Sequence, residues 1–181
     1  KWYGEKLKMR ISPALTQKSY INSIDTLNYS YFSPELNLEF DTRDIFWNPK
    51  RGIRIIQTIV PMIGENSFYI WNQSLSIYIP SYFNITLALN TTIQKKYGYR
   101  NDVWINYFGN SFNIRGWKLP ENKSASNNYR FGHDYVFSTL ELRKLIIADN
   151  IKSGLSKGVS IVAFIDGGFI GSTWERLNKN K

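Results

Sequence analysis

The segment FNITLALNTTIQ, residues 83–94, alternates apolar and polar side chains almost throughout. Its apolar positions are Phe83, Ile85, Leu87, Leu89 and Ile93. Its polar positions are Asn84, Thr86, Asn90, Thr92 and Gln94. Because successive side chains of a β-strand point to opposite faces, this period of two predicts a strand with one apolar and one hydrophilic face.

Six other segments show a similar alternation, and the seven together predict an all-β chain. They are residues 5–15, 31–41, 53–62, 68–79, 135–146 and 159–168. The alternation is weakest in 53–62, where a β-bulge would explain the slip. Each strand would hold about 10 to 12 residues, which is close to the length that crosses a bilayer when tilted.

The hydrophilic faces of these segments carry Asn, Ser, Thr, Lys, Arg and Glu side chains. A dry protein core would leave many of those groups without hydrogen-bond partners, whereas a water-filled lumen would satisfy them. Tyr69, Trp71 and Phe83 lie near strand ends on the apolar faces, as the aromatic girdles of membrane barrels do. The pattern therefore favours a membrane barrel with a wet interior.

Residues from about 95 to 133 show no alternation and are rich in Asn, Gly, Ser and Tyr. Loops of this length are uncommon in compact domains unless they have a function. Arg115 lies in this loop, and Asp166 lies on the hydrophilic face of the last predicted strand. The same period of two places Phe164 and Glu141 on hydrophilic faces.

Composition argues against several kinds of function. The formal net charge is +9, but the Lys and Arg residues are scattered, so we expect no nucleic-acid binding. The chain has no cysteine and one histidine, His133, which we expect to be solvated in a polar loop. Neither a metal site nor a cofactor is therefore predicted. We expect no catalytic residue and no Gly-x-Ser-x-Gly nucleophile elbow, and hence no enzyme.

Four short motifs follow one another along the second half of the chain. They are Phe108-Gly109-Asn110-Ser111, Ile114-Arg115-Gly116-Trp117, Glu141-Leu142-Arg143 and Phe164-Ile165-Asp166-Gly167-Gly168. Earlier, Asp41-Thr42-Arg43-Asp44 leads into a turn with Pro49 and Gly52. In order and approximate spacing these pieces resemble the barrel of the BamA-like outer-membrane assembly superfamily, also called the bacterial surface-antigen family. Trp117 departs from that family, in which Phe is commoner at this position.

The resemblance implies a role for each motif. The long loop would fold back into the barrel, where Arg115 meets Asp166 beside Phe164, and Gly116 permits their close approach. Trp117 completes the loop motif and Gly168 completes the strand motif. The resemblance also implies lumen charges that satisfy one another, namely Glu141, Arg143, Asp41 and Arg43. On the residues alone, Arg115 and Asp166 could simply be solvated charges of a loop and a strand.

The resemblance further implies a fold, a function and partners. We expect an antiparallel transmembrane β-barrel of about sixteen strands, of which residues 1–181 form an internal fragment of about seven. Members of the family are non-enzymatic outer-membrane proteins that insert or translocate polypeptides. The expected partners are unfolded outer-membrane protein substrates, accessory periplasmic or lipoprotein subunits and outer-membrane lipid, in a bacterium of Gram-negative type rather than an organelle.

Two alternatives stay open. A two-partner secretion transporter shares the same motifs but exports a dedicated substrate through its pore. A soluble β-sandwich or ligand-binding barrel would also contain alternating strands.

Overall fold

The computed structural model describes residues 6–21, 26–46, 48–99, 104–109, 114–118, 130–150 and 156–171. Several expected features therefore lie outside the described residues. They are both chain ends, much of the loop at 95–133, and Asn110, Ser111 and Asn113 beside or within its motifs.

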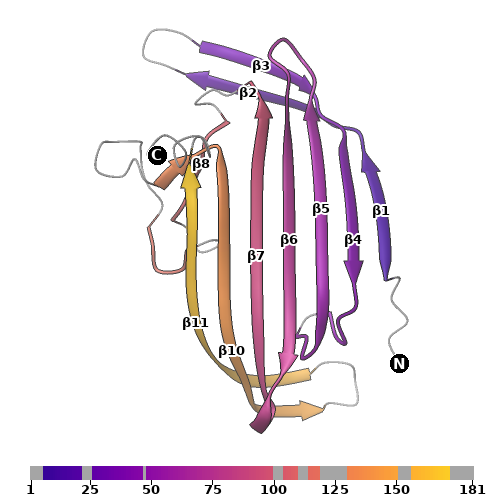
Figure 1. The fold of residues 1–181 in the computed structure, drawn as a ribbon, viewed down its shortest axis with the longest axis vertical. Coiled ribbons are helices and arrows are strands. Elements are labelled where there is room, and N and C mark those ends of the chain that lie inside the picture. Colours follow the sequence, from indigo (N-terminus) through magenta and orange to yellow (C-terminus); the bar gives the residue numbers. More distant parts are fainter. Residues whose placement is uncertain are drawn as a thin grey trace, which may run out of the picture.

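Seven antiparallel strands form one sheet in the order β1-β4-β5-β6-β7-β10-β11. They are β1 (Leu7–Ser12), β4 (Glu35–Asp41), β5 (Gly52–Met62), β6 (Phe68–Pro80), β7 (Ile85–Gly98), β10 (Asp134–Asn150) and β11 (Ser156–Gly171). Figure 1 shows the long central strands side by side, with β1 at one edge and β11 at the other. The predicted all-β antiparallel fold is therefore confirmed.

The first hairpin of the sheet bends where each of its two strands is interrupted by a proline. The continuations beyond the bend are β2 (Leu15–Ile21) and β3 (Thr26–Phe32), which pair with each other. Pro13 and Pro34 lack the N–H that a ladder requires, so both strands break at the same level. The Ser33 N–H donates to the Ala14 carbonyl oxygen at 2.8 Å and keeps the strands together. In Figure 1, β2 and β3 lie across one end of the main sheet.

The sheet has one apolar face and one hydrophilic face. Exposed residues of the apolar face include Met9, Leu38, Ile59, Tyr69, Leu142 and Ile165. Buried polar residues of the opposite face include Thr86, Lys96, Thr139 and Glu141. The strand register keeps these two sets on opposite sides from β1 to β11. Among the described residues, no helix is long and apolar enough to span a membrane.

The bulge expected in residues 53–62 is absent, because β5 pairs with β4 and β6 without a shift in register. A shift in register occurs instead in the β10–β11 ladder, between Leu145 and Ile147. The alternation of β5 weakens for another reason: Ile56, Val60 and Met62 all lie on the hydrophilic face, where Met62 is buried with Tyr31 and Phe68. Trp104 packs edge-on against both of these rings, so a small apolar cluster lies at this end of the sheet.

The alternating pattern predicted that a strand begins at Phe83, but the structure places Phe83 outside the strand. It lies in the short 3₁₀ turn η1 (Tyr82–Asn84) between β6 and β7, and its φ is +59°. The Phe83 side chain is 84% exposed. The predicted strand therefore began too early, because the two turn residues Phe83 and Asn84 continue the apolar–polar pattern by chance.

Candidate functional site

Strand register brings the predicted site residues together on the hydrophilic face. In the β10–β11 ladder, Glu141 lies opposite Phe164 and Thr139 lies opposite Asp166. Residues two apart on a strand share a face, so Glu141 and Asp166 are diagonal neighbours there. The two carboxylates therefore come from adjacent strands and face the same space.

Arg115 reaches these carboxylates from the loop between β7 and β10. Its backbone N–H and its Nε both donate to Asp166 Oδ2, at 3.0 and 2.8 Å. Its Nη2 donates to Asp166 Oδ1 at 2.7 Å, and its Nη1 donates to Glu141 Oε1 at 2.9 Å. One guanidinium thus holds two strands at once, through the charge-assisted fork that suits arginine and carboxylate.

The strand side of this network is shielded from water. The Asp166 side chain is 4% exposed and the Glu141 side chain 11%, whereas the Arg115 side chain is 31% exposed. Hydrogen bonds to Asp166, and then to Glu141, hold the pKa of Arg115 above its usual value. Glu141 also accepts a hydrogen bond from Arg143 Nε at 2.6 Å. Two arginines therefore compensate two carboxylates, as burial of charge requires.

In the described part of the loop, Ile114–Trp117 form a tight turn, in which the Trp117 N–H donates to the Ile114 carbonyl oxygen at 3.3 Å. Gly116 has a φ of +83°, which residues with a side chain rarely adopt. Nothing among the described residues lies within 4 Å of the position its Cβ would take. Among the described residues the feature that favours glycine at this position is thus the backbone conformation of the turn, and the expected close approach at Gly116 stays a prediction.

The ring of Phe164 forms the floor under the guanidinium. The Arg115 Cζ lies 3.5 Å from the centroid of that ring, which places the cation on the ring face. Phe164 remains 47% exposed, so the contact covers only part of its surface. The predicted neighbours Arg115, Asp166 and Phe164 are thus brought together.

Phe108 seats another part of the loop on the same wall. Its side chain is 5% exposed, and its ring makes edge contacts with Tyr135 and Phe137 at centroid distances of 6.0 and 6.5 Å. A Cβ on Gly168 would lie 2.9 Å from this ring and 2.6 Å from the Val136 carbonyl oxygen. Gly168 is therefore the glycine of the site that a close approach requires.

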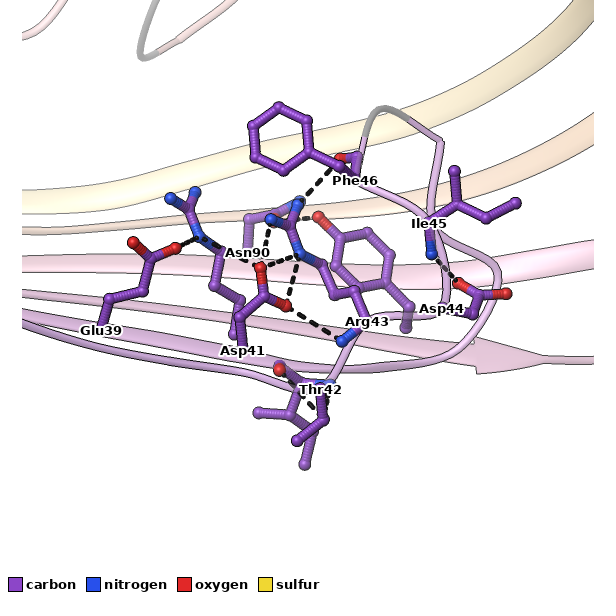
Figure 2. A network of polar contacts seen from close by, with 11 residues as sticks. Glu39, Asp41, Thr42, Arg43, Asp44, Ile45, Phe46 and Asn90 are labelled. Atoms are coloured by element: carbon purple, nitrogen blue, oxygen red, sulfur yellow. Dashed lines mark hydrogen bonds and ion pairs between the residues drawn. The ribbon is translucent and has the colours of Figure 1, made fainter. Parts of the chain in front are cut away.

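A second ion cluster lies at the turn after β4 (Figure 2). Arg43 donates to both oxygens of Asp41, through Nε at 2.9 Å and Nη2 at 2.6 Å, and to the Phe46 carbonyl oxygen at 3.1 Å. Arg54 Nε donates to Glu39 Oε1 at 2.7 Å and lies 3.9 Å from Asp41 Oδ2. The side chains of Arg43 and Asp41 are 7% and 11% exposed, so this pair is also largely buried.

The strand register connects the two clusters through one row of cross-strand neighbours. The row consists of Asp41, Arg54, Ser76, Asn90, Thr139 and Asp166. Tyr78 lies beside it, with its hydroxyl 3.5 Å from Asn90 Oδ1 and its ring centroid 5.6 Å from Arg143 Cζ. Asn48 of the β4–β5 turn and Arg115 of the loop line the same hollow. Arg54 and Tyr78 were not predicted, because no local pattern marks them.

His133 does not lie where the sequence indicated. Its exposed fraction is 7%, so it is buried rather than solvated. Its backbone N–H donates to the Gly171 carbonyl oxygen, and its backbone carbonyl oxygen accepts from Asn106 Nδ2, both at 2.9 Å. It follows β9 (Phe131–Gly132), which pairs with β8 (Asn106–Tyr107) at the two ends of the loop.

Residues 154–158, GLSKG, do fit the Gly-x-Ser-x-Gly pattern, so the expectation that it is absent was wrong. Gly154 and Leu155 lie outside the described residues, whereas Ser156 begins β11 and pairs with Asn150. A nucleophile elbow needs a sharp strand-to-helix turn, and an antiparallel ladder is a different setting. Within the described ranges, no group of three or more acidic or histidine side chains could hold a metal ion.

Comparison with known protein families matches residues 5–181 to the Omp85 superfamily domain. Proteins of this superfamily are outer-membrane or organellar-membrane proteins that act in polypeptide insertion or secretion. No curated protein matches the chain. Because the family match includes the whole seven-stranded sheet, the Arg115 loop and both ion clusters, the chain belongs to the Omp85 superfamily.

Proposed function

We propose that these seven strands belong to a non-enzymatic outer-membrane barrel that inserts other polypeptides into a membrane of Gram-negative type. The observation that carries the proposal is the attachment of Arg115 to Asp166 and Glu141 of the inner wall. A loop held in this way occupies the interior of the barrel. Because a two-partner secretion transporter would share this loop and its partners, the experiment below distinguishes insertion from secretion.

The edges of the sheet support the assignment to a larger closed barrel. Within the described residues, β1 and β11 each pair with one neighbour only. An open edge leaves backbone N–H and C=O groups without partners, and lipid supplies none. We therefore propose that further strands of the complete protein pair with β1 and β11.

The two faces of the sheet indicate the proposed partners. Outward residues such as Ile161 and Ile165, which are 63% and 72% exposed, would contact outer-membrane lipid. Unfolded outer-membrane proteins would be the clients, and accessory periplasmic or lipoprotein subunits would deliver them. A soluble β-sandwich would cover such a face with a second sheet, and within the described residues no second sheet packs on it.

The test is an Arg115→Ala variant of the complete protein, compared with Arg51→Gln, which removes an exposed arginine elsewhere. The abundance of heat-modifiable client barrels in the outer membrane is measured by gel shift. We expect Arg115→Ala to lower client assembly while the protein itself stays in the outer membrane, and Arg51→Gln to leave assembly unchanged. Normal client assembly with loss of a secreted substrate would instead identify a two-partner secretion transporter.

A further inference from the structure

Arg130, at the returning end of the loop, contacts two other parts of the loop. Its Nε donates to the Phe108 carbonyl oxygen at 2.9 Å, and its own carbonyl oxygen accepts from the Phe108 N–H at 2.8 Å. Its Nη2 donates to the Lys118 carbonyl oxygen. Its Cζ lies 5.1 Å from the centroid of the Trp117 ring. One side chain thus joins the segment at Phe108 to Trp117, the last residue of the Arg115 turn, and to Lys118, which follows it.

Gly109 leaves the space through which this guanidinium passes. A Cβ at Gly109 would overlap Arg130 Nη2 and would lie 2.5 Å from the Lys118 carbonyl oxygen. Its φ of +123° also favours glycine. The missing side chain leaves room for Arg130, and the backbone angle separately favours glycine at this position.

From these contacts we infer that Arg130 is the positioning residue for the Arg115 turn. Phe108 is fixed on the wall over Gly168, and Arg130 ties this fixed point to Lys118 and Trp117. The turn is thereby held in place before Arg115 binds its carboxylates, which reduces the conformational entropy lost on docking. The consequence for client insertion rests on the function proposed above, whereas the position of the loop does not.

Lysine cannot replace Arg130 in this arrangement. The guanidinium uses separate nitrogens for two carbonyl oxygens while its Cζ lies 5.1 Å from the centroid of the Trp117 ring. A lysine ammonium is a single strongly hydrated charge without that planar fork. We therefore expect that Arg130→Lys, which keeps the charge but loses the planar shape, does not hold the turn.

The experiment uses the complete protein in detergent, with Arg130→Gln, Arg130→Lys, Arg115→Ala and the double variant Arg115→Ala/Arg130→Gln. Limited trypsin digestion reports the position of the loop, because cleavage after Lys118 requires its backbone to leave the docked state. Arg51→Gln is the matched control, and client assembly is measured in parallel. A Trp117→Leu variant removes the ring but keeps Arg130, in case Arg130→Gln does not fold.

We expect Arg130→Gln and Arg130→Lys to keep the heat-modifiable gel shift and to raise cleavage at Lys118 roughly tenfold, since hydrogen bonds from a charged group are lost. Trp117→Leu should raise it less. The double variant should be cleaved no faster than the more open single variant, because both arginines hold one turn. Client assembly should fall with each Arg130 variant.

Three results would overturn the inference: unchanged cleavage in Arg130→Gln, full restoration by Arg130→Lys, or multiplicative effects in the double variant. If Arg130→Gln loses the gel shift, the Trp117→Leu variant is used in its place. Unchanged cleavage at Lys118 in that variant would then overturn the inference. Increased cleavage with normal client assembly in both the Arg115 and Arg130 variants would leave the positioning role standing and refute the proposed function. The two failures are therefore distinguishable.

Discussion

The turn cluster and the loop–wall cluster use the same chemistry over very different distances along the chain. Arg43 and Asp41 are two residues apart, whereas Arg115 and Asp166 are 51 residues apart. Both arginines bind a carboxylate through Nε and Nη2. The two ion pairs therefore have the same chemistry, and they differ in the length of chain that must become ordered for each pair to form.

The local pair needs only the end of β4 and its turn. The distant pair must also order a long loop, so the entropy of ordering that loop opposes it. The Asp41 cluster should therefore contribute to the stability of the sheet, whereas the Asp166 cluster should control whether the loop is docked. Three substitutions test this difference, all in the complete protein.

Asp166→Asn is expected to have the largest effect. It removes the charge that binds Arg115 through three hydrogen bonds, and docking of the loop should weaken by about 3 kcal/mol, roughly a hundredfold. The rate of trypsin cleavage at Lys118 should rise accordingly while the heat-modifiable shift persists. Equal cleavage of variant and wild-type protein would mean that the loop is held mainly by other contacts.

Asp41→Asn is the matched change at the other cluster. Since the Arg43 side chain would lose its buried partner but the turn can relax toward water, we expect a loss of about 2 kcal/mol in sheet stability. The temperature at which the gel shift disappears should fall, and cleavage at Lys118 below that temperature should stay at the wild-type rate. Faster cleavage would show that the row of residues between the clusters transmits the change to the loop.

Phe164→Leu should have the smallest effect. It keeps an apolar side chain under Arg115 and removes only the ring, so docking should weaken by about 1 kcal/mol. The expected rise in cleavage at Lys118 is roughly fivefold, with no change in the melting of the gel shift. A rise as large as that of Asp166→Asn would place the ring contact on a par with the ion pair.

Sequence reasoning and structure agree where a property depends on neighbouring residues. The hydrophilic positions of Glu141 and Asp166 follow from the period of two, because side chains alternate in any β-strand. The same rule did not recognise the turn at Phe83, where the alternation continues beyond the strand. It also attributed the irregular pattern of β5 to a bulge, whereas the register is regular and Ile56, Val60 and Met62 face the hydrophilic side.

By itself, the sequence determined the strands, their two faces and the residues available for ion pairs. The pairing of Arg115 with Asp166 was predicted from the family resemblance, because the sequence alone did not show which of 14 acidic residues would bind that arginine. Tertiary structure alone decided that Glu141 shares the guanidinium, that Phe108 requires Gly168, and that Arg130 fastens the turn. The physical reason is that alternation is a property of each strand alone, whereas these contacts depend on strand register and on the return path of a loop.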